Sequence, residues 1–306
     1  MTMHLAISFD QNYLIPFYAL VGSIFYHNKN EKLVFHCIIT GISENEKQKI
    51  ITYLQNNQAD IYFYDIDETL IQKFMGTIRG TWTLAVYYKM FFPLLVPKDL
   101  DKLLYIDTDA LVINPLIDLY QQDLENYPLG AVYDCYVKTQ PEIGITTEGN
   151  YFNSGVLLFN LPIWRQQQIS EKAIQFLQQY PEKIKFVDQD AMNAVLINNW
   201  KKLPEKYNLI YTYLPQDASR QELERFIQDK VIIHFTLQRP WAFICKNRFR
   251  HLYKFYLKKT PKRNEKIITD FTFAKILPYL RLRLVEWYLD NAWVQAIWRK
   301  IKIKRR

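Results

Sequence analysis

The sequence predicts an α/β fold, with a mixed, mostly parallel sheet covered by helices on both faces and followed by a basic helical extension. Three observations lead to this expectation. Short apolar runs alternate with helix-like segments through the first half of the chain. Of the 306 residues, 49% are apolar and 23% are charged, which supports a large core and excludes global disorder. The basic residues concentrate near the C-terminal end.

The first elements follow one another in β-α-β-α-β order. The expected strands are the compact apolar runs at residues 5–9, 33–39, 61–64 and 103–106. A helix begins near Pro16, and a second runs toward Gln55 from Ser43, whose spacing to Glu46 is that of a capping box. In parallel sheets of this kind, ligands bind beyond the carboxyl ends of the strands. Polar residues directly after each run are therefore the first candidates for a site.

The second half continues the pattern without an internal repeat. Further strands are expected at residues 129–133, 156–160 and 231–235, and helices at 163–179 and 190–197.

Charge is distributed unevenly along the chain. Residues 1–244 carry 21 Lys and Arg against 27 Asp and Glu, a net charge of −6, whereas residues 245–306 carry 18 against 4, a net charge of +14. A uniformly basic nucleic-acid-binding protein would not show this profile. It is typical of an enzyme-like body with an appended element that seeks an anionic surface. We place the domain boundary between residues 245 and 246.

The N-terminal region predicts a cytoplasmic protein. It lacks the basic segment of a secretory signal. The apolar stretch at residues 13–26 contains Pro16 and Gly22 and is shorter than the roughly 20 residues that span a bilayer. Three widely spaced cysteines match neither a disulfide framework nor a zinc site, which favours a reducing compartment.

Asp107 and Asp109 are the strongest candidates for a metal site. The Asp-x-Asp triplet occurs four times, so its context must decide. Here the apolar residues 102–106 deliver both carboxylates to the end of a strand. Charge in that place costs free energy unless it is paired or bound to a metal. Two carboxylates and an imidazole suit Mn²⁺ or Mg²⁺, and the alternative is a capping or surface pair in a loop.

Three other polar positions lie next to expected strands or helices. His234 directly follows the apolar residues 231–233 near the end of a strand and precedes Arg239 by five residues. This suits a metal ligand beside a phosphate-binding cation, although a lone His is more often a packed residue. Asn153 precedes a Gly and an apolar strand. Asp188 precedes a helix, where, taken in isolation, a plain N-cap is the slightly favoured interpretation.

A competing hypothesis rests on Asp65 and Asp67, which follow the strand at residues 61–64. This segment resembles the first motif of haloacid-dehalogenase-like phosphatases, in which the first Asp attacks phosphorus and the second acts as acid and base. That chemistry also needs a later Lys and a further acidic pair. No such pair follows, so these residues are better interpreted as the start of a helix.

Five segments in order resemble glycosyltransferase family 8, which includes bacterial lipopolysaccharide galactosyl- and glucosyltransferases. They are residues 7–13, 104–109, 151–158, 188–193 and 233–241, and the resemblance covers roughly residues 4–245. It implies a glycosyltransferase A-type, Rossmann-like nucleotide-sugar-binding domain. The implied reaction moves galactose or glucose from a UDP-sugar to a saccharide acceptor on lipopolysaccharide, lipooligosaccharide or a related glycan, with retention of configuration.

The resemblance also implies roles for single residues. Asp107, Asp109 and His234 would hold Mn²⁺ or Mg²⁺ on the diphosphate of the UDP-hexose donor, with Thr108 between the two acids. The segment that binds uridine corresponds to Ser8, Asp10 and Asn12. Lys89 falls where relatives often have an Arg facing the donor. The positions that contact the donor sugar correspond to Asp134, Asn153, Asp188 and Gln189.

The implied mechanism depends on stabilising the leaving group. Negative charge develops on the diphosphate as the bond to the anomeric carbon breaks, and a divalent cation and Arg239 would absorb it. Gln189 and Asp188 are the catalytic candidates, but an amide oxygen is only weakly basic, so Gln189 is a poor nucleophile. We therefore expect the acceptor to attack on the same face that the diphosphate leaves.

Two departures from the family pattern bear on activity. Leu237 stands where the family usually has a Gly, which matters for close backbone approach to a phosphate. Arg239 replaces a Lys, exchanging a point charge for a planar fork. A non-catalytic glycan- or membrane-binding relative therefore stays open as an alternative.

The extension at residues 246–306 predicts a membrane-associating helix. Leu284, Trp287, Val294, Trp298 and Ile301 share approximately helical spacing among many Lys and Arg residues. Basic, Trp-rich helices of this kind lie in the interface of anionic membranes. The alternative is a helix that packs its Trp face onto the body. We expect a peripheral protein at the inner face of the membrane, with a lipid-linked saccharide as acceptor and no nucleic acid as partner.

Overall fold

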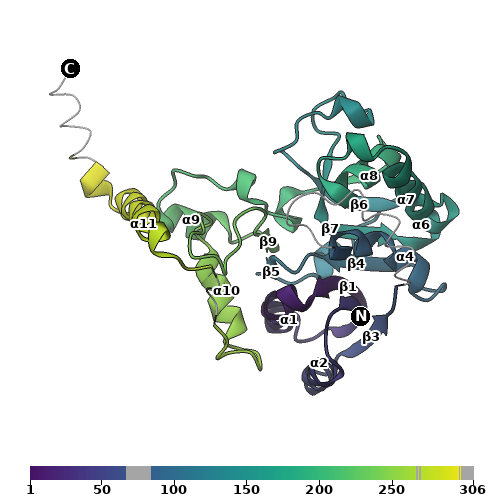
Figure 1. The fold of residues 1–306 in the computed structure, drawn as a ribbon, viewed down its shortest axis with the longest axis horizontal. Coiled ribbons are helices and arrows are strands. Elements are labelled where there is room, and N and C mark those ends of the chain that lie inside the picture. Colours follow the sequence, from purple (N-terminus) through teal and green to yellow (C-terminus); the bar gives the residue numbers. More distant parts are fainter. Residues whose placement is uncertain (67–83, 267, 269, 296, 298–306) are drawn as a thin grey trace.

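The computed structural model describes residues 1–66, 84–266, 268, 270–295 and 297 (Figure 1). Its main sheet has seven strands in the order β3-β2-β1-β4-β7-β6-β8, and β5 and β9 form a separate ribbon. The strands are β1 (Thr2–Asp10), β2 (Lys32–Thr40), β3 (Asp60–Tyr64), β4 (Lys102–Ile106), β5 (Ala110–Val112), β6 (Leu129–Tyr133), β7 (Phe152–Asn160), β8 (Lys201–Leu203) and β9 (Ile232–His234). Only β7 runs against its neighbours in the main sheet, so the predicted mixed, mostly parallel sheet is confirmed.

Helices cover both faces of this sheet, as Figure 1 shows. The described α-helices of the chain are α1 (Leu14–His27), α2 (Glu44–Asn56), α4 (Phe92–Leu95), α5 (Ile117–Tyr120), α6 (Leu161–Gln166), α7 (Ile169–Gln179), α8 (Val187–Val195), α9 (Arg220–Phe226), α10 (Arg250–Leu257) and α11 (Ile276–Asp290), of which α9, α10 and α11 lie beside the sheet. A 3-10 helix, η3 (Leu84–Met90), also packs near the sheet.

Two hydrophobic cores lie on opposite faces of the sheet, because side chains alternate along a strand. Leu5, Ile7 and Phe9 of β1 point into the core that α1, α2 and α10 complete. Ala6 points into the other core, which α6, α7 and α8 cover. This arrangement leaves the strand ends, where polar residues follow each apolar run, as the place for a site.

The expected elements are found with small differences in their bounds. Ser43 caps α2 by accepting a hydrogen bond from the Glu46 amide at 3.3 Å. The single helix predicted at residues 163–179 is wrong, because the chain breaks into α6 and α7 at Gln168. Its φ of +52° lies in the left-handed region, which an α-helix cannot continue through.

The small β5–β9 ribbon was not predicted as a separate sheet, and it positions the site. Its antiparallel register places Ala110 opposite His234. The amide of Phe235 donates to the carbonyl of Asp109 at 2.9 Å. Two segments more than 100 residues apart are thereby fixed side by side.

The C-terminal region begins as part of the body. Tyr253, Tyr256 and Leu257 of α10 are buried in the core that includes α1, and the Tyr256 hydroxyl lies 2.7 Å from His27 Nε2. The first helix after the proposed boundary at residue 245 therefore packs on the N-terminal half. Within the described residues, no helix is long and apolar enough to cross a membrane.

Candidate active site

The candidate site lies at the carboxyl edge of the main sheet. There β1 ends at Asp10, β4 leads into Asp107, and β6 leads into Asp134. Because β7 is antiparallel to β4 and β6, its first residues lie at the same edge, which brings Asn153 beside Asp134. Sheet topology alone thus gathers four polar side chains from distant parts of the sequence.

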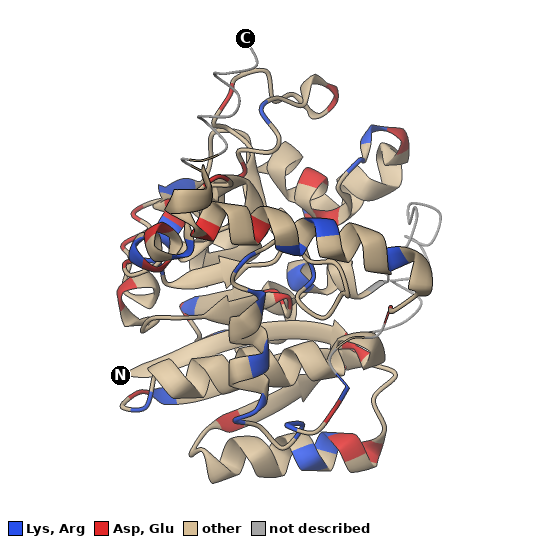
Figure 2. Ribbon diagram, turned by 90° about the vertical axis from the view of Figure 1, so that its left-hand side faces the viewer, with Lys and Arg blue, Asp and Glu red and all other residues tan. Residues whose placement is uncertain are grey.

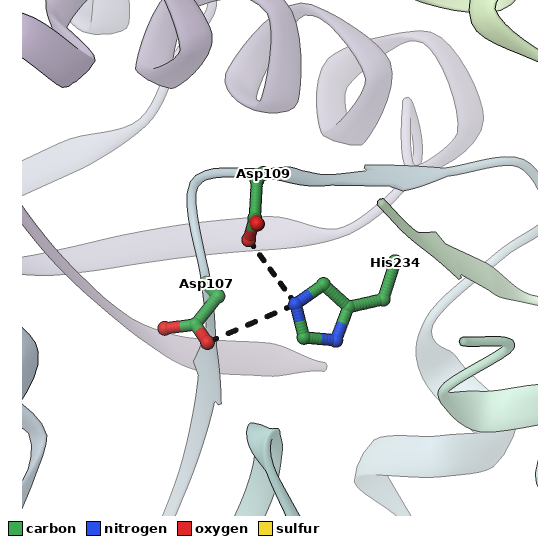
Figure 3. Close-up of side chains that lie close together, drawn as sticks. All are labelled: Asp107, Asp109 and His234. Carbon is green, nitrogen blue, oxygen red and sulfur yellow. Dashed lines mark hydrogen bonds and ion pairs between the residues drawn. The ribbon is translucent and has the colours of Figure 1, made fainter. Parts of the chain in front are cut away.

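Asp107, Asp109 and His234 converge at this edge, as Figure 3 shows. His234 Nε2 lies 3.1 Å from Asp109 Oδ1 and 3.9 Å from Asp107 Oδ2. One ligand atom from each of the three residues lies within 4.8 Å of the others. His234 is only 3% exposed, whereas both acids are partly accessible. Thr108 is buried between them.

A glycine makes room for this imidazole. A Cβ atom at Gly155 would lie 2.0 Å from His234 Cε1 and 2.9 Å from Asp107 Oδ2. The amide of Asp107 also donates to the Gly155 carbonyl at 2.8 Å. Any side chain at residue 155 would therefore displace His234 or Asp107.

The three residues fit a divalent cation. Carboxylate oxygens with one imidazole nitrogen form a donor set that suits Mn²⁺ or Mg²⁺. The electrostatics point the same way. Burial opposes charge on His234, but Asp109 and then Asp107 overcome it and raise the pKa of the imidazole. Burial likewise opposes ionisation of Asp109, and His234 nonetheless lowers the pKa of that carboxyl. The cluster therefore attracts positive charge.

Lys89 of η3 supplies one such charge. Its Nζ lies 3.1 Å from Asp107 Oδ1 and 3.2 Å from Asp188 Oδ2. Burial lowers the pKa of this ammonium, but the two carboxylates outweigh it and raise the pKa. Burial raises the pKa of Asp188, with the Asp107 charge adding to it against Lys89. One buried lysine thus links the candidate metal ligand Asp107 to Asp188 of α8.

Asp188 is not an N-cap, so that interpretation of the sequence is wrong. It lies in the first turn of α8 and accepts a hydrogen bond from Ser154 Oγ at 2.8 Å. Asp190 instead receives the amides of Lys185 and Phe186, at 2.6 and 2.8 Å. Val187, a β-branched residue, holds a φ of +45° directly before Asp188. Such strain costs about 1–3 kcal/mol and persists where the surroundings enforce it.

Amide side chains link the remaining predicted sugar contacts. Asp134 Oδ2 accepts from Asn153 Nδ2 at 3.0 Å and from Gln189 Nε2 at 3.1 Å. Gln189 Oε1 in turn accepts from the Ser154 amide at 2.9 Å. The four predicted sugar contacts are Asp134, Asn153, Asp188 and Gln189. Through Ser154 they lie in one hydrogen-bond network with the cluster of Asp107, Asp109 and His234.

The predicted uridine segment is more open. The Asp10 carboxylate accepts from the Asn12 amide at 2.9 Å, and Asn12 is exposed. Ser8 is buried and lies 3.0 Å from the Tyr105 hydroxyl. Arg239 is exposed, with its Cζ 5.7 Å from the centroid of the Tyr13 ring. Asp109, Asp107 and Asp10 all act electrostatically on Tyr13, whose pKa burial raises to about 12.

Leu237 occupies a backbone position that favours glycine. Its φ is +60° and its side chain is 74% exposed. A leucine in the left-handed region costs roughly 1–2 kcal/mol. The turn that the family builds with Gly is therefore retained here with a strained residue, and the exposed side chain points away from the core.

Three residues of this network were not among the predicted site residues. The Tyr105 hydroxyl donates to Asp107 Oδ1 at 2.6 Å, and Ser154 contacts both Asp188 and Lys89. Strand periodicity could have found Tyr105, which lies two residues before Asp107 on the same face. Asn208, whose Oδ1 lies 3.0 Å from His234 Nδ1, had no sequence signal.

The competing phosphatase segment is placed elsewhere. Asp65 is exposed and follows β3, the edge strand of the sheet, while Asp67 lies outside the described residues. In the described part of the chain, the group of metal-ligating side chains that converges is the one around His234.

Comparison with known proteins agrees with this geometry. The profile of glycosyl transferase family 8 matches residues 4–245. General stress protein A of Bacillus subtilis (strain 168) is 28% identical over 271 residues, which cover 84% of this chain and 94% of that protein. The lipopolysaccharide 1,2-glucosyltransferase of Escherichia coli (strain K12) is 28% identical over 271 residues, which cover 86% and 80%.

The fold has a close counterpart among solved structures. The galactosyltransferase LgtC, crystallised with donor and acceptor sugar analogues, superposes with a TM-score of 0.72 over 90% of this chain and 99% of that one, at 23% identity. This likeness confirms the fold. The match to the family profile spans most of the chain and contains every residue of the cluster, and on that evidence the protein belongs to glycosyltransferase family 8.

Proposed function

We propose that the protein transfers galactose or glucose from a UDP-sugar to a saccharide acceptor on lipopolysaccharide or a related glycan, with retention of configuration. The observation that carries this proposal is the convergence of Asp107, Asp109 and His234 at the carboxyl edge of the sheet. The glucosyltransferase and galactosyltransferase named above support a hexose as the transferred group. The E. coli relative supports lipopolysaccharide as the acceptor.

Asp107, Asp109 and His234 would hold Mn²⁺ or Mg²⁺. A divalent cation bound there supplies positive charge to the diphosphate as it leaves. Arg239 lies near Tyr13 and the Asp10 segment, where it can reach the same diphosphate from the exposed side.

The contacts of α8 favour attack from the face that the diphosphate leaves. Both amide atoms of Gln189 are already hydrogen-bonded, to Asp134 and to the Ser154 amide. Asp188 is tied to Lys89 and Ser154, and Asp190 is fully buried. None of these groups is free to attack an anomeric carbon. Trapping a covalent sugar on Asp188 or Asp190 during turnover would overturn this mechanism.

A thermal-shift screen of UDP-sugars with and without Mn²⁺ tests the proposal. We expect one UDP-hexose to raise the melting temperature, and to do so only with the metal, because a ligand stabilises the folded state to which it binds. UDP alone and a GDP-sugar serve as controls. The same change in melting temperature without metal, or no change with any UDP-hexose, would contradict the assignment and favour a non-catalytic relative.

We also propose that the C-terminal region binds the inner, anionic face of the cytoplasmic membrane. Leu277, Leu280, Leu284 and Trp287 form a stripe along α11, and each is at least 50% exposed. Polar contacts fix the opposite side of the helix, where buried Glu286 pairs with Arg250. The apolar stripe therefore faces outward, which is the reverse of an ordinary surface helix.

The C-terminal region also carries cations beside α10, which would complement an anionic surface. Lys254, Lys258, Arg263 and Lys266 line one cavity beside α10. Figure 2 shows Lys and Arg distributed over the ribbon. Of the tail positions predicted to share the apolar face, Val294 is buried, and Trp298 and Ile301 lie outside the described residues. Trp287 is 50% exposed, which supports an outward-facing stripe over the alternative in which the Trp face packs onto the body.

Cosedimentation with vesicles tests the membrane proposal. We expect binding to phosphatidylglycerol–phosphatidylcholine vesicles and little binding to phosphatidylcholine alone. Leu284→Glu combined with Trp287→Glu should abolish it. Leu94→Glu, an exposed leucine on α4, is the matched control and should bind as the wild type does. Equal binding of the double variant would exclude α11 as the contact.

A further inference from the structure

The second ring nitrogen of His234 has a buried partner that no motif contains. His234 Nδ1 lies 3.0 Å from Oδ1 of Asn208, and Asn208 is fully buried. Backbone hydrogen bonds fix this proximity. The amide of Leu209 donates to the Ile232 carbonyl at 2.9 Å, and the amide of His234 donates to the Leu209 carbonyl at 3.0 Å. Residues 208 and 209 thus run alongside β9.

The orientation of the Asn208 amide follows from a chain of donors and acceptors. The backbone N–H of Gly155 donates to Asn153 at 3.0 Å, so the atom that receives it must be Asn153 Oδ1. The other amide atom of Asn153 is then Nδ2, which donates to the Asp134 carboxylate. Asn208 also reaches Asn153 Oδ1, at 2.8 Å, and can do so only through its own Nδ2.

This assignment determines the state of the imidazole. With Asn208 Nδ2 turned to Asn153, Asn208 Oδ1 faces His234 and can only accept a hydrogen bond. His234 Nδ1 must therefore carry the proton. In the neutral ring the lone pair then lies on Nε2, the nitrogen that faces Asp109 and Asp107.

The chain of hydrogen bonds is anchored on the backbone at two points, Gln189 and Asn153. Gly155 N–H fixes Asn153, and the N–H of Ser154, the preceding residue, fixes Gln189 through its Oε1. Asp134 Oδ2 joins the two halves by accepting from Asn153 and Gln189. Two consecutive peptide groups of β7 therefore set the direction of every hydrogen bond from Gln189 to His234.

We propose that Asn208 is a positioning residue that holds His234 as the Nδ1–H tautomer and turns Nε2 toward the two aspartates. The inference deepens the proposed function, on which the identity of the bound cation rests. Partners of this kind orient metal-binding histidines, and their loss lowers metal affinity by about 10–100-fold. Asn208 also ties this orientation to the sugar-contact network through Asn153.

The direct test is ¹⁵N NMR of the histidine side chains at alkaline pH, without metal. His234 is one of five histidines and is identified by the signals lost in His234→Gln. We expect a neutral ring with the proton on Nδ1, and addition of diamagnetic Mg²⁺ should shift only its Nε2 resonance strongly. A proton on Nε2 in the wild-type protein would overturn the proposal.

Two variants separate positioning from general stability. Asn208→Leu should weaken Mn²⁺ binding, measured by electron paramagnetic resonance, by about 10–100-fold. Asn208→Asp keeps an acceptor for Nδ1–H and should retain the affinity of the wild type, although it is less stable because its carboxylate meets Asn153 Oδ1. Asn28→Leu is the matched control, since Asn28 is a buried, hydrogen-bonded Asn at the C-cap of α1. It should lower stability and leave Mn²⁺ affinity unchanged.

The outcomes distinguish this inference from the proposed function. If the wild type binds Mn²⁺ and Asn208→Leu binds it equally well, the positioning role is wrong and the metal site stands. If the Mn²⁺ affinity of Asn208→Asp is lowered as much as that of Asn208→Leu, Asn208 has a structural role only. If the wild type binds no divalent cation, the metal assignment fails, and the tautomer measured without metal still decides whether Asn208 sets the ring.

Discussion

The ammonium group of Lys89 lies 3.2 Å from the carboxylate of Asp188, and both side chains are buried. The same nitrogen lies 3.1 Å from Asp107, one of the proposed metal ligands. Lys89 therefore compensates two negative charges that would otherwise destabilise each other at the end of β4.

Replacing Lys89 with Met should lower the free energy of unfolding by about 3–5 kcal/mol, because it leaves buried carboxylates unpaired. Added Mn²⁺ should recover part of this loss by binding the folded state. Urea unfolding with and without Mn²⁺ measures both effects.

Lys230→Met is the control for the loss of Lys89. Lys230 is also buried, but its partners Asp229 and Glu205 are 69% and 46% exposed. Its loss should cost about 1 kcal/mol or less. Similar losses in both variants would show that Lys89 does not compensate the site.

Asp109→Asn should reduce sugar transfer by at least about 10²-fold while leaving the fold intact, because it removes one ligand of the proposed cation that stabilises the leaving diphosphate. Transfer from a radiolabelled UDP-hexose, together with circular dichroism, measures the two properties. Asp101→Asn, in another Asp-x-Asp triplet that is exposed at the start of β4, should behave as the wild type. Near-normal transfer by Asp109→Asn with added Mn²⁺ would refute the metal assignment.

Leu237→Gly should stabilise the protein by up to about 1 kcal/mol. The substitution relieves backbone strain of roughly 1–2 kcal/mol at a left-handed position. Part of this gain is lost, because glycine increases the conformational entropy of the unfolded chain. Chemical denaturation measures the change. Asp217→Gly, at an exposed position outside the set of positive φ angles, should instead destabilise the protein. Destabilisation by Leu237→Gly would mean that the leucine side chain makes a stabilising contact.

His36 should make stability fall in mild acid. Burial, with a smaller effect of His4, lowers the pKa of His36 to about 4 from an ordinary value of 6.5. Between these pH values the unfolded chain binds a proton that the folded chain does not, so stability is present above pH 6.5 and is lost as the pH falls toward 4. The loss amounts to at most about 3 kcal/mol.

His36→Phe tests this dependence. The variant loses the hydrogen bonds to His4 and Tyr64, so it should be less stable at neutral pH. The difference between variant and wild type should shrink as the pH falls from 6.5 to 4. A constant difference over that range would show that His36 does not titrate in this window.

Most of the sheet could be predicted from the sequence, because compact apolar runs such as residues 5–9 and 103–106 bury both faces of a strand. The helix at 163–179 was predicted without its break, since a left-handed φ at a Gln leaves no mark in the pattern of apolar residues. The β5–β9 ribbon was missed as a sheet for a similar reason: three-residue strands are too short to show periodicity.

The sequence by itself predicted most of the residues that meet at this edge of the sheet, because polar residues that directly follow apolar runs lie at the ends of strands and because five segments resemble the family pattern. Only the tertiary structure decided how these groups are paired. Lys89 joins Asp107 to Asp188, and Asn208 contacts His234. Both arrangements depend on how segments far apart in the chain pack against each other. Hydrogen bonds and ion pairs act over a few ångströms, so their partners are chosen by packing in three dimensions and not by spacing along the chain.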